Sequence, residues 1–258
     1  MRYSSLGGGK RIRPTLCIAA AEAVGGSMQD VMHSACALEV LHTYTLIHDD
    51  LPCMDNDDLR RGNPTSHIKF GEANAVLAGD ALLTLAFEWI GQTPAPKPYL
   101  PTQLVLELAQ ASGSRGVIAG QVEDLAGEGA TLGEDDLQFI HHHKTAMLIR
   151  GAARIGCIAA GGKPHELNAL TRYGADIGLA FQIADDVLNV TSNKETLGKP
   201  VGSDEKRDKN TYVRIHGLSR ARDMANERVD HAVQALEELS GDPGPLAAIA
   251  RFIVSRDS

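Results

Sequence analysis

The chain has 258 residues, of which 43% are hydrophobic and 22% charged, as expected for a globular protein with a sizeable core. Its formal net charge of -8 excludes a broad nucleic-acid-binding surface, because such a surface needs an excess of Lys and Arg. Aromatic residues make up only 4% of the chain, which favours close-packed helices over sheets.

The first distinctive segment, residues 7–14, reads GGGKRIRP. Its glycines let the backbone approach an anion closely, and Lys10, Arg11 and Arg13 supply positive charge. The segment is not a Walker A loop, because Arg11 stands where that motif has Ser or Thr. Taken alone, it indicates either an anion-binding loop or a basic surface turn.

Apolar residues recur at steps of three and four across residues 27–47, which predicts an amphipathic helix. Pro52 ends the pattern, so the acidic pair Asp49 and Asp50 should lie at the end of this helix. His42 precedes Asp49 by seven residues, about two helical turns, and should project toward the same space. A histidine satisfied by hydrogen bonds inside the protein is the alternative interpretation.

Five aspartates lie within ten residues at the end of this helix, in the sequence HDDLPCMDNDDLRRG. Adjacent carboxylates about 4 Å apart repel by roughly 4 kcal/mol at an effective dielectric of about 20, so the cluster needs water or cations. Magnesium prefers such oxygen ligands and is usually held by one or two carboxylates together with substrate phosphates. The cluster therefore predicts a diphosphate anchor, and a solvated acidic loop is the alternative.

Helical patterns continue over most of the remaining chain, at residues 73–90, 100–126, 135–161, 164–190, 220–240 and 246–255. Strand-like alternation is scarce, and the longest interruption is a polar loop at residues 191–210. The sequence contains no repeat and no hinge-like linker, so we expect one all-α domain over residues 1–258.

A second acidic pair, Asp185 and Asp186, ends the apolar sequence IGLAFQIA and shares a helix face with Gln182. Carboxylates in a buried stripe demand a partner, although an acidic helix end paired with surface lysines is the alternative. Lys144 similarly interrupts an apolar face, where its ammonium needs an anion unless the side chain snorkels to water. The adjacent histidines 141–143 cannot bind one metal from a single helix face.

The cysteines are Cys17, Cys36, Cys53 and Cys157, and they form no CxxC pair that would indicate a disulfide framework or a zinc site. No segment reaches the roughly 18 uninterrupted apolar residues of a membrane span, and Met1 leads into polar sequence. We therefore expect a soluble cytoplasmic protein without a membrane span.

Several of these segments together resemble the trans-type polyprenyl synthetase family, particularly its short-chain farnesyl and geranylgeranyl diphosphate synthases. The resemblance runs from GGGKRIRP through HTYTLIHDDLPCMDNDDLRRGNPTSH, LAGDALLTLAF, GQVEDL, HHHKTAMLIRGA and GLAFQIADDVLNV to LGKPVGSDEKRDKNTY. It implies a single-domain isoprenoid-synthase helical bundle around a central cavity. It also implies a magnesium-dependent prenyltransferase, commonly a homodimer, that condenses isopentenyl diphosphate with dimethylallyl or geranyl diphosphate.

The resemblance also assigns roles to individual residues. Magnesium, with about three ions per site once substrate is present, would be bound by Asp49, Asp50 and Asp55 of the first aspartate-rich motif and by Asp185 and Asp186 of the second. The allylic substrate would be bound by Arg60, Lys144, Thr145, Gln182, Lys199 and Lys209. Isopentenyl diphosphate would be bound by Lys10, Arg13, His42 and Arg61. Catalysis would rest on Asp49, Asp50, Asp55, Lys144, Asp185 and Lys199.

The implied reaction begins with ionisation of the allylic carbon–oxygen bond, continues with attack by the isopentenyl double bond and ends with loss of a proton. Magnesium and lysines would neutralise the departing diphosphate. Tyr44 and Thr45 occupy the fifth and fourth places before Asp49, where the growing tail would pass. An aromatic residue at the fifth place is similar to bacterial farnesyl diphosphate synthases. We therefore expect farnesyl diphosphate as product, with geranylgeranyl diphosphate as the alternative.

Two features depart from the family pattern. Asn189 stands where the second motif normally has a third aspartate, which predicts weaker magnesium binding with activity retained. The chain begins almost at GGGKRIRP, so we expect the N-terminal helix or helices of the family to be absent.

Other functions remain open on the sequence alone. A noncatalytic partner subunit of a heteromeric prenyltransferase is one alternative, and the intact first acidic motif argues against it. A terpene cyclase would not need a second diphosphate pocket. A phosphohydrolase with a metal dyad at His48 and Asp49 would leave Asp185 unexplained.

Overall fold

The computed structural model describes residues 1–100, 102–130, 132–191 and 211–256, and nearly all regular structure in these ranges is helical. The α-helices are α1 Arg2–Ser5, α2 Ile12–Glu22, α3 Met28–Asp49, α4 Ser66–Phe70, α5 Glu72–Gly91, α6 Gln103–Ser112, α7 Val117–Ala126, α8 Glu134–His141, α9 Met147–Ala159, α10 Pro164–Thr191, α13 Tyr212–His216, α14 Leu218–Ala235 and α15 Gly244–Ser255. A π-helical turn, η1, covers His142–Ala146, and a 3-10 turn, η2, covers Leu236–Glu238. The short strands β1 (Leu59–Arg60) and β2 (Asn63–Pro64) pair as an antiparallel hairpin. The all-α class is confirmed.

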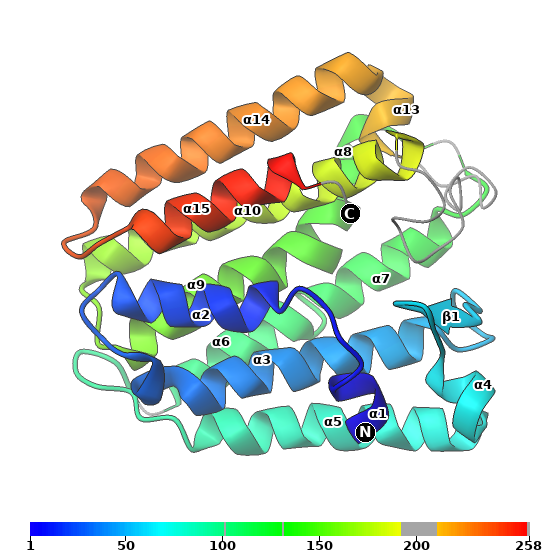
Figure 1. Cartoon of the computed structure of the whole chain (residues 1–258), viewed down its shortest axis with the longest axis horizontal. Coiled ribbons are helices and arrows are strands. Elements are labelled where there is room, and N and C mark those ends of the chain that lie inside the picture. Colours follow the sequence, from blue (N-terminus) through cyan, green and yellow to red (C-terminus); the bar gives the residue numbers. More distant parts are fainter. Residues whose placement is uncertain (101, 131, 192–210, 257–258) are drawn as a thin grey trace.

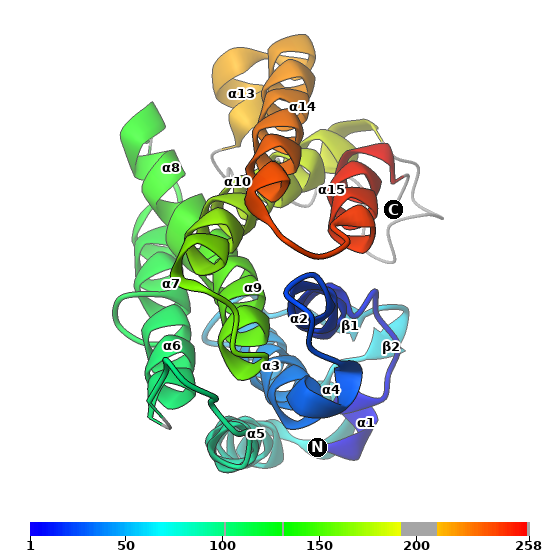
Figure 2. The same ribbon diagram turned by 90° about the vertical axis from the view of Figure 1, so that its left-hand side faces the viewer.

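Helix α9 forms the centre of the bundle (Figures 1 and 2). It packs against α2, α3, α6 and α10, and every α9 residue except Arg150 and Arg154 is buried. Helices α14 and α15 cover α10 on one side, whereas α5 lies along α3 at the opposite edge. Gly156 lets α9 approach α2 closely, because a Cβ at this position would collide with the carbonyl oxygen of Cys17.

The helix predicted at residues 27–47 is α3, which carries the first acidic motif at its end. Its start is capped by Ser27, whose backbone N–H and hydroxyl both donate to the Asp30 carboxylate, at 2.8 and 2.7 Å. Its apolar stripe is buried, including Val31, Leu38 and Leu41 at 0% exposure. The period of the sequence therefore located both this helix and its buried face.

Two of the long helices predicted from the sequence are interrupted in the structure. Residues 100–126 form α6 and α7, because Gly113 adopts an extended conformation after α6 and Gly116 packs against the carbonyl oxygen of Ala111. Residues 135–161 form α8, the π-helical turn η1 and then α9. The second break matters for the candidate site, because η1 contains the predicted site residues Lys144 and Thr145.

Helix α2 was not predicted, because its start lies within the segment interpreted as a basic loop. Pro14 stands in its first turn, where the missing backbone N–H costs no hydrogen bond. Its buried face is built mainly from alanines 19–21 and Leu16. Short helices α1, α4 and α13 also went unpredicted, since fewer than two turns leave no recognisable period.

Helix α5 packs on α3 through one face and leaves the other exposed. Ala75, Gly79 and Leu82 are buried, whereas Val76 and Leu77 are 40% and 64% exposed. By length and composition, α5 is long and apolar enough to cross a membrane, with a mean hydropathy of 1.3 in a window of which 28% is buried. The absence of a membrane span therefore stays a prediction.

Candidate active site

The first acidic motif lies at the C-terminal end of α3. Asp49 is the last residue of the helix, and the backbone N–H of Asp55 donates a 2.8 Å hydrogen bond to the Asp49 carbonyl oxygen. The loop thereby returns Asp55 to the helix end. Burial raises the pKa of Asp49 to about 6; Lys144 opposes this shift, and the nearby Asp55 carboxylate adds to it. Asp49 is thus a carboxylate whose negative charge the protein alone disfavours.

The neighbouring carboxylate, Asp50, is held by Arg60 of strand β1. Arg60 Nε donates to both carboxylate oxygens of Asp50, at 2.8 and 3.0 Å, and its Nη2 lies 2.6 Å from Oδ1. Asp50 is only 3% exposed, so this bidentate pair fixes the hairpin against the end of α3. The expected role of Asp50 as a magnesium ligand stays a prediction, because its carboxylate binds Arg60 in this structure.

Lys144 and Thr145 lie in the π-helical turn η1. Turns of this type are rare in proteins as a whole, but those that occur are often found at functional sites. Lys144 Nζ donates a 2.6 Å hydrogen bond to Oδ2 of Asp124 on α7. The ammonium also acts electrostatically on Asp49 at the end of α3. Lys144 thus pairs with a protein carboxylate, and the first acidic motif lies within its field. Its predicted contact with the allylic diphosphate stays a prediction.

Hydrogen bonds join η1 to the second acidic motif on α10. Thr145 Oγ1 donates to Gln182 Oε1 at 2.9 Å, and Gln182 Nε2 donates to Asp186 Oδ1 at 3.2 Å. Asp186 is 3% exposed, and its Oδ2 accepts a 2.8 Å hydrogen bond from the backbone N–H of Tyr212. Both Asp186 oxygens therefore bind protein groups, and Asp185, with a side chain 43% exposed, is the more accessible of the pair.

The residues predicted to bind isopentenyl diphosphate lie between the two motifs. Burial lowers the pKa of Arg13 to about 10, while Asp185 nearby favours its charge. Lys10 also interacts electrostatically with Asp185. Burial and the positive charges of Arg13 and Arg61 lower the pKa of His42 well below its ordinary value, so the ring is neutral at neutral pH. Cations thus connect His42 on α3 with Asp185 on α10.

The sequence did not reveal the role of two further residues of the site. Arg256, which follows α15, forms an ion pair with Asp185 while its side chain is only 3% exposed. Its guanidinium carbon lies 4.1 Å from the centre of the Phe181 ring. Asp124 lies in the matched segment GQVEDL, but the segment does not reveal that its partner is Lys144. A single charged residue without periodic neighbours cannot be assigned a distant partner from sequence.

The remaining predicted residues are placed as follows. Tyr44 and Thr45 are 8% and 9% exposed, and the Tyr44 ring meets the His48 ring edge-on with centroids 5.3 Å apart. Both lie on α3 in the turn before the first motif, and their predicted role in chain length stays a prediction. Lys199 and Lys209 lie outside the described residues, so their predicted contacts with the allylic substrate stay predictions.

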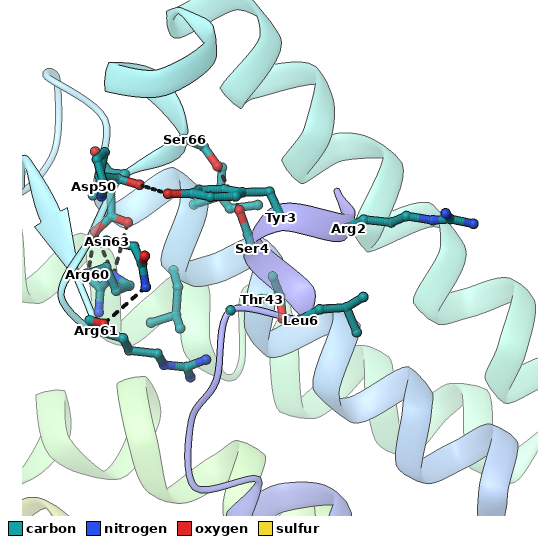
Figure 3. A pocket seen from close by; sticks show the side chains of 15 residues that line it. Arg2, Tyr3, Ser4, Leu6, Thr43, Asp50, Arg60, Arg61, Asn63 and Ser66 are labelled. Carbon is teal, nitrogen blue, oxygen red and sulfur yellow. Dashed lines mark hydrogen bonds and ion pairs between the residues drawn. The ribbon is translucent and has the colours of Figure 1, made fainter.

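A cavity of about 300 Å³ lies beside the first motif (Figure 3). Its walls come from α1, from the hairpin and from α3, and they include Asp50 and Arg60. The hydroxyl of Tyr3 braces one wall by donating a 2.8 Å hydrogen bond to the Pro64 carbonyl oxygen. The Asp50–Arg60 pair is therefore a wall shared by this cavity and the acidic site.

The carboxylates of the site fit magnesium better than a softer metal. Among the described residues, no three His, Cys, Asp or Glu side chains form a ready-made cage, and all four cysteines are free thiols. The oxygen donors Asp49, Asp55 and Asp185 are of the kind that magnesium prefers when substrate phosphates complete its shell. The raised pKa of Asp49 supports this fit, because a cation would relieve its cost of ionisation.

The helical bundle, its two acidic helix ends and the cations between them define a diphosphate-binding enzyme of the isoprenoid-synthase class. The chain belongs to the polyprenyl synthetase family, whose model matches residues 1–242. The proposed family, its helical fold and its prenyltransferase activity are thereby confirmed.

Known members of the family differ in product. Geranylgeranyl pyrophosphate synthase 7 of Arabidopsis thaliana is 48% identical over 262 residues, covering 100% of this chain and 76% of its own length. An FPP/GFPP synthase from Zymomonas mobilis is 38% identical with a TM-score of 0.86, and the match covers 98% of this chain and 86% of that one. A geranyltransferase from Helicobacter pylori, solved with magnesium and an isoprenyl diphosphate, is 36% identical with a TM-score of 0.84, at coverages of 98% and 85%.

Proposed function

We propose that this short-chain prenyltransferase uses magnesium to join isopentenyl diphosphate to an allylic diphosphate, with geranylgeranyl diphosphate as its product. The observation that carries the proposal is the buried Asp49 carboxylate, which is disfavoured as an anion and lies within the field of Lys144. A doubly charged leaving group bridged by cations suits such a site. The solved relative that contains magnesium and an isoprenyl diphosphate supports the choice of metal and substrate.

Different protein groups would bind the allylic diphosphate and isopentenyl diphosphate. Bound magnesium would neutralise the departing diphosphate as a Lewis acid. Lys144 adds a fixed positive charge beside the first motif, and the Thr145–Gln182 hydrogen bond holds the neighbouring polar groups in one orientation. Arg13, which keeps its charge at neutral pH despite burial, offers a preorganised partner for the second diphosphate.

The relatives and the residue at position 44 favour different product lengths. The curated relatives with 48–50% identity are geranylgeranyl pyrophosphate synthases, so they support the alternative product better than the expected farnesyl diphosphate. One observation still favours farnesyl diphosphate as a second candidate. Tyr44 is 8% exposed and its ring packs edge-on against His48, one residue before Asp49, so a bulky aromatic side chain lies next to the first motif.

Incubation of the purified chain tests the proposal directly. Isopentenyl diphosphate is combined in turn with dimethylallyl, geranyl and farnesyl diphosphate, with either magnesium or EDTA, and the dephosphorylated products are sized by chromatography. We expect product with magnesium and none with EDTA. If no starter is extended, while a partner synthase changes its product when the chain is added, the noncatalytic-subunit alternative replaces the proposal.

Replacement of Tyr44 by alanine is expected to lengthen the product by at least one isoprene unit. The change removes a buried ring from the wall that the growing tail would meet, and the void it leaves admits more hydrocarbon. Chromatographic sizing of the products of wild type, Tyr44→Ala and the control Tyr44→Phe provides the measurement. The phenylalanine control keeps the ring and should keep the wild-type product. An unchanged product from Tyr44→Ala would remove this residue from the control of chain length.

We also propose that the chain forms a homodimer through the exposed face of α5. Val76 and Leu77 on α5 are 40% and 64% exposed, and large apolar side chains exposed next to each other are typical of an interaction surface. Sedimentation of wild type should give twice the chain mass of 27.5 kDa. Leu77→Asp should shift the protein toward monomer, whereas Leu6→Asp, at a 76% exposed position on the N-terminal segment, should not.

A further inference from the structure

Gln121 on α7 is a buried polar residue whose side chain has no partner among the described residues. It is 9% exposed, and neither its amide oxygen nor its amide nitrogen makes a hydrogen bond there. Buried polar atoms are almost always satisfied, because an unmade hydrogen bond costs free energy. A structural glutamine would bind neighbouring protein groups, so this amide is suited to a partner that arrives from outside.

Gln121 lies between two residues of α7 that meet Lys144. Gly120 packs directly on η1, since a Cβ there would lie 2.6 Å from the Lys144 Cα. Asp124, one turn further along α7, binds the Lys144 ammonium at 2.6 Å. Residues three apart on a helix lie on the same face, with Cβ atoms about 5–6 Å apart. Gln121 therefore lies on the face of α7 that meets the predicted binding site for the allylic diphosphate.

A second unsatisfied group lies in the same region. His141 is 6% exposed, and its Nδ1 has no hydrogen-bond partner among the described residues. The charges of Asp124 and Lys144 both act on this ring. Unsatisfied polar atoms from α7 and α8 thus flank the Lys144–Asp124 pair, where a polar ligand would complete them.

We infer that Gln121 is a further substrate-binding residue, whose carboxamide binds the allylic diphosphate beside Lys144. The inference rests on the proposed function and deepens it. The diphosphate offers only acceptor oxygens, so the Gln121 Nε2 donates to it. The Oε1 accepts from the Lys144 ammonium, which carries three donors, and the amide then steadies the lysine against the anion.

Gln121→Met tests the inference, because methionine keeps the length and volume of glutamine and removes its polar atoms. We expect the KM for the allylic substrate to rise about tenfold, while the KM for isopentenyl diphosphate and the melting temperature stay near wild type. Gln138→Met, at an exposed position on α8, serves as the matched control and should change neither constant. Gln121→Glu, which sets a negative charge against the diphosphate, should weaken allylic binding further.

Calorimetry with magnesium and a non-ionising allylic thiodiphosphate separates this inference from the proposed function. Weaker analogue binding by Gln121→Met supports the inference even if wild type were to form no product, a result that would overturn the proposed function alone. Equal analogue binding by wild type and Gln121→Met overturns the inference. A lower melting temperature with unchanged binding would also overturn it, because Gln121 would then have a purely structural role.

Discussion

Asp49→Asn is expected to abolish turnover and, at the same time, to stabilise the protein in the absence of metal. The variant keeps the shape of the side chain but removes the negative charge with which Asp49 would bind the proposed magnesium ion. If Asp49 binds the metal as proposed, its loss should reduce kcat/KM by about a thousandfold or more, equivalent to at least about 4 kcal/mol of transition-state stabilisation. Steady-state kinetics with saturating magnesium provide the measurement.

The stability effect follows from the raised pKa of Asp49. In the folded protein this pKa is about 6, whereas an unfolded aspartate titrates at about 3.9. Between these values the folded state holds the proton more tightly, so stability falls as the pH rises through this window and stays lower above it. At pH 8 in EDTA, Asp49→Asn should therefore unfold at higher denaturant concentration than wild type, by about 1–3 kcal/mol.

The stability difference between wild type and Asp49→Asn should depend on pH and on the position of the substituted carboxylate. Near pH 4 the two proteins should have similar stability, because Asp49 is protonated in the folded wild type. Asp58→Asn changes an exposed carboxylate in the same acidic run and should give no such gain at pH 8. Magnesium with diphosphate should stabilise wild type more than Asp49→Asn. Equal stability of wild type and Asp49→Asn at pH 8 in EDTA would mean that burial places no cost on this carboxylate.

Gly120→Ala is expected to reduce kcat by about a hundredfold, although alanine is the better helix former. The added methyl would lie 2.6 Å from the Lys144 Cα and still closer to its backbone nitrogen, so α7 and η1 must separate. A shift of this kind moves Lys144 and Thr145, and misplacement by about 1 Å can cost about a hundredfold in rate. Kinetic constants and the thermal transition would be measured together.

Gly91→Ala is the matched control for this variant. Gly91 is the last residue of α5, and a Cβ there meets no atom within 4 Å. Alanine at this position should leave kcat unchanged and stability equal or slightly higher. A wild-type kcat for Gly120→Ala would show that η1 does not need this close contact to position its lysine.

The sequence allowed those parts of the molecule to be predicted that depend on local periodicity. The apolar period located α3, α5 and α10, and it placed both acidic motifs at helix ends. It could not show the π-helical turn at residues 142–146, because a π turn adds one residue without changing composition. It also merged α6 with α7, since Gly113 and Gly116 looked compatible with a continuous helix.

The site was predictable in its residue types but less so in its partnerships. The resemblance assigned Thr145, Gln182 and Asp186 to one site, and the hydrogen bonds from Thr145 to Gln182 and from Gln182 to Asp186 connect η1 to α10. It did not indicate that Asp124 binds Lys144 or that Arg256 binds Asp185. Each of these pairs joins distant segments through single side chains, and only the packing of the helices brings them together.

The hydrogen bonds that join Thr145 to Asp186 through Gln182 all point the same way, from donor to acceptor. The Thr145 hydroxyl proton points to Gln182 and the Gln182 amide protons point to Asp186, so every bond dipole in the series has the same sense. Asp186 terminates the series, because both of its carboxylate oxygens accept hydrogen bonds. The lone pairs of the Thr145 oxygen are consequently left facing away from Gln182, which makes this hydroxyl an electron-rich surface for any centre that becomes positive beside it.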